Sequence, residues 1–196
     1  LARHLAAIGY DIDVFTRRDS EKLPEIMEWL PHVRVINVPA GPATFVRKED
    51  MLPYLGEFTT YMLNFMEREW RPYALMHANF WMSGLVAADI KRELGVPFVI
   101  TFHALGKVRR LHQGGADEFA DDRFAIEERI IAEADLVIAE CPQDAEDMVN
   151  LYHADPERLR IVPAGFDPSE LWPVDKAQAR RKLGLDAKER IILQLG

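Results

Sequence analysis

The chain has 196 residues, of which 48% are hydrophobic and 29% are charged, a composition typical of a globular protein with a normal core. Its formal net charge of −8 argues against nucleic acid and anionic membranes as partners, because both attract basic surfaces. No apolar run approaches the roughly 18 residues that span a bilayer, so we expect no transmembrane segment. The one cysteine, Cys141, cannot form an internal disulfide, which suits a reducing compartment. We therefore expect a soluble, cytoplasmic protein.

Both ends of the sequence resemble interior segments of a longer chain. The first residues have helical apolar spacing and stop at Gly9, but no N-cap residue and no initiator methionine precede them. The last residues, ERIILQLG, form a strand-like run that finishes on a glycine, as a βα unit begins. We expect a piece of a larger protein that is truncated at both ends.

Strand and helix patterns alternate between these ends. The expected strands are 11–16, 33–38, 74–78, 97–103, 135–140 and 158–163. The expected helices are 50–70, 83–94, 119–133 and 142–153. Apolar strands that alternate with helices predict an α/β fold with a Rossmann-like, doubly wound parallel sheet. The stripe of Met and aromatic residues in 50–70 is interpreted as core packing rather than as a cofactor-binding surface.

A composition change near residue 163 predicts a domain boundary. Prolines at 163, 168 and 173 are typical of a stiff connector, and Asp175 and Gln178 form a capping box for a short helix that stops at Gly184. We expect an α/β domain at 1–165, a linker and helix at 166–187, and the first strand of a second domain at 188–196.

The stretch TFHALGKVRR places basic residues directly after an expected strand. His103 closes the strand, Lys107, Arg109 and Arg110 follow, and residues 104–116 contain no acidic residue. Cationic side chains of this kind bind phosphates through charge-assisted hydrogen bonds. The pattern predicts an anion site on a basic loop beside His103; the alternative is a solvated basic loop with no ligand.

Other polar residues and glycines also fall at strand ends. Ligands of open α/β sheets bind beyond the carboxyl ends of the strands, which is where His77 and Glu140 are expected. Glycines that allow a close approach of the backbone to a ligand, or a sharp turn, are Gly84, Gly106 and Gly165. Asp11 and Asp13 form a DxD pair, but at the start of a strand, so we expect no metal there.

Five blocks of the sequence, taken in order, resemble one family. They are LARHLAAIGYDIDVFTRR, MHANFWMSG, PFVITFHALGKVRRLHQG, ERIIAEADLVIAECPQD and RIVPAGFDPSELWP. Together they are similar to the N-terminal half of retaining nucleotide-sugar glycosyltransferases of group 1 (family 4), which include sucrose-phosphate synthases. The resemblance implies a GT-B architecture, in which two Rossmann-like domains face a cleft. It also implies that the first strand and glycine-rich loop of the first domain are missing here.

The resemblance assigns roles to individual residues. His103 matches a histidine that contacts the donor sugar near the reacting centre, so it is the expected catalytic residue. Lys107 and Arg109 fall where the family often binds a phosphorylated acceptor. The residues that match an H-x-H-Y-W-x-S-G pattern are His77, Trp81, Ser83 and Gly84. Asn79 and Phe80 depart from that pattern, which leaves the acceptor open.

The resemblance also implies a reaction. A nucleotide-sugar donates its sugar to a sugar, sugar-phosphate or related acceptor with retention, and neither a metal nor an organic cofactor takes part. The groups that bind the donor diphosphate would lie outside this sequence, so we expect the chain alone to be inactive. Two alternatives remain, a sugar-nucleotide epimerase of similar architecture and a non-catalytic sugar-binding or regulatory module.

Overall fold

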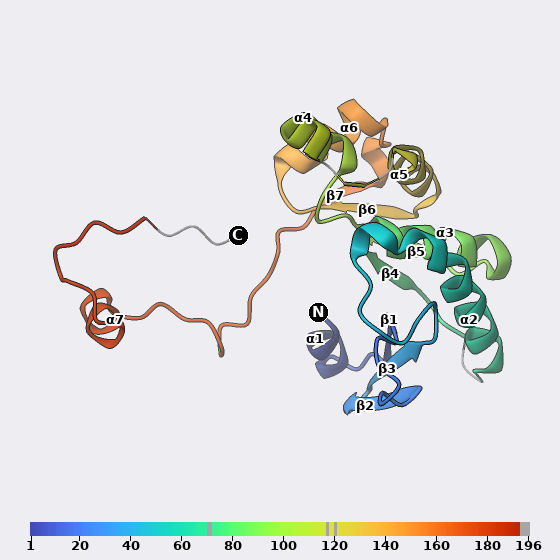
Figure 1. The fold of residues 1–196 in the computed structure, drawn as a ribbon, viewed down its shortest axis with the longest axis horizontal. Helices are drawn as coiled ribbons and strands as arrows, with labels where there is room; N and C mark the ends of the chain where they lie inside the picture. The colour runs from blue at the N-terminus through green and yellow to red at the C-terminus, as the bar shows by residue number, and fades with distance from the viewer. Residues whose placement is uncertain (70–71, 117, 120, 193–196) are drawn as a thin grey trace. The chain divides into compact units, whose positions relative to one another are not determined.

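The computed structural model of the protein describes residues 1–69, 72–116, 118–119 and 121–192. The chain divides into two compact units, Leu1–Pro163 and Ala164–Gly196 (Figure 1). The first unit carries two β-sheets, and the described part of the second carries one helix, α7 (Lys176–Leu183). None of the described helices is long and apolar enough to cross a membrane. The predicted α/β class is confirmed.

The smaller sheet of the first unit contains three strands in the order β1 (Ile12–Arg17), β3 (Val33–Val38) and β2 (Ile26–Leu30). β1 and β3 are parallel, whereas β2 runs antiparallel to β3. The sequence pattern does not predict β2, and this strand makes the sheet mixed rather than purely parallel. The cause is the two-residue connection between β2 and β3, because so short a turn joins only antiparallel neighbours.

The larger sheet contains four parallel strands in the order β4 (Met76–Asn79), β5 (Phe98–Thr101), β6 (Leu136–Ala139) and β7 (Leu159–Ile161) (Figure 1). Asn79 pairs with Thr101, and Thr101 pairs with Ile138. The carboxyl ends of β4, β5 and β6 therefore lie level with one another. Residues that follow these strands meet at one edge of the sheet.

The helices of the first unit are α1 (Ala2–Ala7), α2 (Leu55–Arg68), α3 (Phe80–Leu94), α4 (Gly106–Gln113), α5 (Asp122–Glu133) and α6 (Pro142–Tyr152). Short 3₁₀ turns lie at Lys48–Asp50, Leu52–Tyr54, Gly114–Ala116 and Pro156–Arg158. The prediction of a basic loop after β5 is wrong, because its basic residues form helix α4. α6 begins as predicted, with Cys141 as N-cap and Pro142 in the first turn.

The core of the first unit lies between the larger sheet and its helices. Fully buried side chains come from β5 (Phe98 and Ile100), from α3 (Ile90) and from α5 (Ile130). The apolar stripe of α2 is buried as well, including Met62, Phe65 and Met66, and α2 packs on α3. The interpretation of that stripe as core packing is confirmed.

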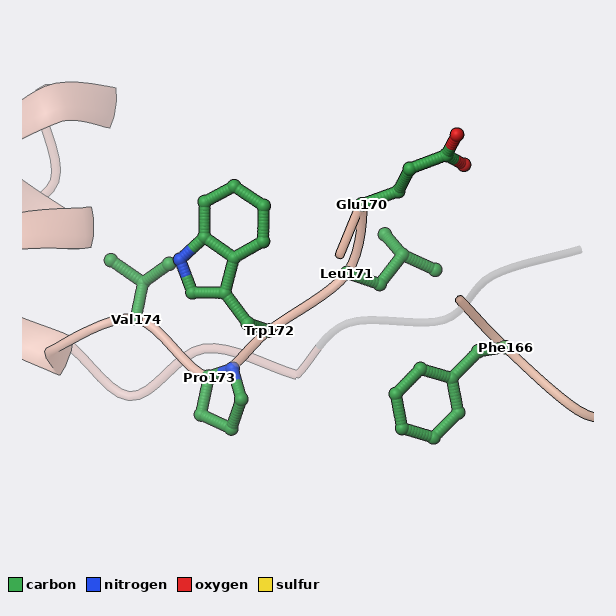
Figure 2. Close-up of a pocket in the computed structure, with 6 residues that line it drawn as sticks. All are labelled: Phe166, Glu170, Leu171, Trp172, Pro173 and Val174. Carbon is green, nitrogen blue, oxygen red and sulfur yellow. The ribbon is translucent and has the colours of Figure 1, made fainter. Parts of the chain in front are cut away.

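The second unit begins as an extended connector. Its helix α7 starts at Asp175, whose carboxylate accepts a 2.9 Å hydrogen bond from the amide of Gln178, and ends at Gly184, as predicted. Residues 188–192 form no strand, and 193–196 lie outside the described residues. The connector alone lines a hollow of about 500 Å³ (Figure 2), with Phe166, Glu170, Leu171, Trp172, Pro173 and Val174 around it.

Candidate functional site

Three strand ends of the larger sheet meet at the imidazole of His103. Its Nδ1 lies 3.0 Å from a carboxylate oxygen of Glu140, which follows β6. Its Nε2 lies 3.1 Å from the side-chain oxygen of Asn79, which ends β4. The carboxylate favours a proton on Nδ1, so Glu140 and Asn79 together fix the plane and the tautomer of the ring. The structure thus brings together His103 and Glu140, two of the predicted site residues.

His77 lies on β4 beside this group and is half-buried. Its Nε2 is 3.0 Å from the hydroxyl oxygen of Thr101 on β5. Burial, and after it the nearby charge of His103, lowers the pKa of His77 below its ordinary value. His77 is therefore a neutral hydrogen-bonding group at neutral pH, held within the sheet next to His103.

The first residues of α3 form an aromatic cluster with Phe119. The ring centroids of Phe80, Trp81 and Phe119 lie 6.1–6.2 Å apart. Trp81, a predicted site residue, is 2% exposed, and its Nε1 has no hydrogen-bond partner in the described part of the chain. Phe80 has a φ of +72°, which is rare for a bulky residue. The strand-to-helix junction beside His103 is therefore both aromatic and strained.

Three positively charged side chains surround the Phe119 ring, and we call them the cation cluster. Lys48 Nζ lies 5.8 Å from the ring centroid, Arg109 Cζ 5.2 Å and Arg123 Cζ 4.7 Å. Arg123 is 1% exposed, and its Nη1 has no hydrogen-bond partner among the described residues. Because like charges repel, such a cluster favours an anion that they share. Residues 102–105, between β5 and α4, form the loop that contains His103, and we call it the His103 loop. The cation cluster is linked to this loop by a 2.8 Å hydrogen bond from Arg123 Nη2 to the carbonyl of Ala104.

The basic residues of α4 are divided between different partners. Lys107 pairs with Glu128, donates a 2.6 Å hydrogen bond to the carbonyl of Leu151, and lies 4.8 Å from the Tyr152 ring. Arg110 pairs with Asp121 at 2.8 Å. Arg109 is the one that lies over Phe119. Arg109 therefore lies at the Phe119 ring, whereas Lys107 ties α4 to α5 and α6; binding of an anion by either residue stays a prediction.

Two of the predicted site glycines, Gly84 and Gly106, have packing roles. A Cβ atom on Gly84 would lie 2.9 Å from Ile130 Cγ2, so this glycine lets α3 approach α5. A Cβ atom on Gly106 would lie 2.9 Å from Arg123 Nε and from Glu127 Oε2. Ser83 is exposed on α3, and Gly165 belongs to the second unit. Contact of these four residues with a substrate stays a prediction.

Lys48, Phe119 and Arg123 are not among the site residues predicted from the sequence. Arg123 and Glu127 share the buried face of α5 with Ile130, but in sequence an i, i+4 Arg–Glu pair is typical of an exposed helix face, so the local pattern does not identify Arg123.

The DxD pair lies away from this site, and both of its carboxylates have partners. Asp11 is 2.8 Å from His32, and Asp13 accepts hydrogen bonds from Arg34 and Tyr73. Within the described ranges, no group of three or more His, Cys, Asp and Glu residues is placed to hold a metal ion.

Comparison with known proteins identifies the family of the chain. A family model described as a glycosyl transferase 4-like domain matches residues 1–165. The chain is 38% identical over 200 residues to the D-inositol 3-phosphate glycosyltransferase of Frankia alni, covering 100% of this chain and 49% of the relative. It is 39% identical over 196 residues to D-inositol 3-phosphate glycosyltransferase 1 of Catenulispora acidiphila, covering 100% of this chain and 46% of the relative.

A solved structure gives the same result. Sucrose-phosphate synthase from Thermosynechococcus elongatus superposes with a TM-score of 0.82 at 31% identity, covering 96% of this chain and 46% of that one. The chain thus spans about half the length of the relatives that it matches. The resemblance to the N-terminal half of group 1 glycosyltransferases is confirmed, and the chain belongs to the glycosyl transferase 4-like domain family.

Proposed function

We propose that this chain is the acceptor-side half of a retaining glycosyltransferase that moves a sugar from a nucleotide-sugar to a phosphorylated sugar or polyol. The observation that carries the proposal is the cation cluster beside His103. The relatives support a phosphorylated acceptor, because their names contain D-inositol 3-phosphate and, as the product of a synthase, sucrose-phosphate.

The cation cluster suits a phosphate rather than a neutral hydroxyl group. A phosphate accepts several hydrogen bonds at once, and each charge-assisted bond is worth about 1.5–3 kcal/mol. The Nη1 group of Arg123 is buried and has no hydrogen-bond partner within the described residues, and a phosphate oxygen would satisfy it. The neighbouring rings of Phe80 and Phe119 exclude water, which strengthens such a bond.

The reaction places the acceptor beside His103. The acceptor oxygen attacks the anomeric carbon on the face from which the nucleoside diphosphate leaves, and the acceptor proton passes to the departing diphosphate. His103 contacts the donor sugar near this carbon, and Glu140 with Asn79 holds its ring in one orientation. We propose that the transfer needs no metal ion and no organic cofactor.

Because the chain spans about half the length of its relatives, we propose that it binds the acceptor but does not transfer sugar alone. The donor diphosphate would be stabilised by positive groups of the other half. The epimerase and non-catalytic alternatives are not favoured, because the relatives are named as glycosyltransferases or, for the solved structure, as a sucrose-phosphate synthase.

Calorimetric titration of the chain tests the acceptor class. We expect D-inositol 3-phosphate or glucose 6-phosphate to bind, and unphosphorylated inositol and glucose to bind at least tenfold more weakly, a difference of about 1.4 kcal/mol. Lys48→Gln removes one exposed charge of the cluster and should lower the affinity for the phosphorylated ligand about tenfold.

Arg92→Gln is the matched control. It also removes one positive charge, but at the C-terminal end of α3, where Arg92 pairs with Glu133. It should leave the affinity unchanged. Equal binding of phosphorylated and unphosphorylated ligands, or equal losses in the two variants, would show that the cluster is not the acceptor site.

A further inference from the structure

Glu127 is the centre of a buried polar network beneath the candidate site. This carboxylate, on α5, is 0% exposed. It accepts hydrogen bonds from the amide of Gly106 at 2.9 Å, from Arg123 Nε at 2.7 Å and from the Tyr152 hydroxyl at 2.5 Å. We call Glu127, Tyr152, Arg123 and the Gly106 amide the buried hub.

The buried hub joins α4, α6 and the His103 loop to α5. Tyr152, at the end of α6, also accepts a 2.7 Å hydrogen bond from the amide of Lys107 in the first turn of α4. Leu105, the N-cap residue of α4, gives no side-chain cap, so Glu127 and Tyr152 satisfy the first two amides of this helix instead. Arg123 holds the carbonyl of Ala104, the residue directly after His103.

A purely structural role does not require a buried polar network here. A buried ion pair loses hydration, and apolar residues of similar volume often stabilise a fold equally well. Burial and the charge of Glu127 raise the pKa of Tyr152, so its hydroxyl keeps the proton that it donates to Glu127. One end of the network is left unsatisfied at Arg123 Nη1, as far as the described residues show. That end lies in the cation cluster.

We propose that Glu127 and Tyr152 are positioning residues, which fix the His103 loop through Ala104 and Gly106 and leave Nη1 of Arg123 available to the acceptor. The part that concerns Arg123 rests on the proposed function. The part that concerns His103 rests on the contacts of the chain alone, so the two can fail separately.

Tyr152→Phe is the variant that tests the network. It removes one hydroxyl without changing charge or ring volume, and leaves the Lys107 amide without its acceptor. Tyr73→Phe is the matched control, because Tyr73 also donates to a carboxylate, that of Asp13, outside the candidate site. Both variants should unfold at lower urea concentration than the wild type.

Circular dichroism first checks that both variants are fully folded. Nuclear magnetic resonance then distinguishes an effect on the position of His103 from a general loss of stability. For Tyr152→Phe we expect shifted ring ¹⁵N signals of His103 and about tenfold faster exchange of the Lys107 amide. We also expect weaker binding of inorganic phosphate. Tyr73→Phe should keep wild-type values for all three. If Tyr152→Phe does not fold, Glu127→Gln replaces it in the ring and exchange measurements.

Loss of stability in Tyr152→Phe with unchanged His103 signals and unchanged Lys107 exchange would overturn the proposal and leave the hub a structural element. The proposal would also be overturned by equal His103 shifts in Tyr152→Phe and Tyr73→Phe. Failure of the wild-type chain to bind inorganic phosphate would contradict the phosphate site, while the result for His103 would still stand or fall by itself.

Discussion

At the scale of single residues, backbone strain collects at the candidate site. His103 has a φ of +57° and Phe80 a φ of +72°, and each follows a strand of the larger sheet. Left-handed backbone costs about 1–2 kcal/mol for a residue with a side chain. The side-chain contacts offset that cost, because His103 is held at both ring nitrogens and the Phe80 ring packs on Trp81 and Phe119. Strain that is maintained in this way is typical of functional positions.

His77 makes the stability of the fold depend on pH. Its pKa is lowered in the folded state from the ordinary value of 6.5, so the unfolded chain binds a proton that the folded chain does not. The effect is absent above that value, and the free energy of unfolding falls as the pH drops below it. One proton is worth at most about 1.4 kcal/mol per pH unit.

The variant His77→Gln keeps a hydrogen-bonding group towards Thr101 but cannot titrate. Urea unfolding between pH 7.5 and pH 5 should give a flatter pH dependence for this variant than for the wild type. Parallel pH profiles for the two proteins would show that the folded state does not shift the titration of His77.

At the scale of elements, two helical glycines have opposite surroundings. A Cβ atom on Gly84 of α3 would lie 2.9 Å from Ile130 and 3.1 Å from Ile100, whereas one on Gly56 of α2 meets nothing within 4 Å. We expect Gly84→Ala to lower the free energy of unfolding by about 1–3 kcal/mol through overpacking. Gly56→Ala should raise it by up to about 1 kcal/mol. Urea unfolding measures both, and equal changes would refute the close approach of α3 to α5.

The sequence predicts helices and strands whose residue types and capping residues lie within the element itself, as for β3 and α6. The pattern predicts β3 at its observed bounds because VRVINV is rich in β-branched residues, and it predicts α6 because Pro142 follows an N-cap position. The pattern does not predict helix α4, because Leu105, which precedes GKVRRLHQ, has no side chain that can cap a helix. Its first amides are bound by Glu127 and Tyr152, which lie 21 and 45 residues away in sequence, and no local pattern shows such contacts.

Of the candidate-site residues, the sequence likewise predicts some and not others. His103 and Glu140 follow buried strands, so strand ends alone predict that they meet. Arg123 reaches the site from a helix on another part of the sequence, as an i, i+4 partner of Glu127. On sequence alone such a pair is typical of an exposed helix face, and only the packing of α4, α5 and α6 shows that it is buried.

At the scale of the whole molecule, a local positive cluster lies on a chain of net charge −8. The overall charge repels anions at long range, but salt screens exposed charges beyond about 8 Å at physiological ionic strength. Recognition of a phosphate therefore depends on the short contacts of the cation cluster. These contacts belong to the first unit, Leu1–Pro163.

We propose above that this unit binds the phosphate of the acceptor beside His103. The most direct measurement is a titration of the ¹⁵N-labelled chain with D-inositol 3-phosphate, followed by nuclear magnetic resonance, with inositol as the comparison. We predict that the largest shifts fall on the amides of Lys48, Ala104 and Arg109 and on the Nε–H of Arg123, and that inositol does not reproduce them. Shifts centred on other residues, or the same shifts with inositol, would show that the phosphate of the acceptor is not bound beside His103.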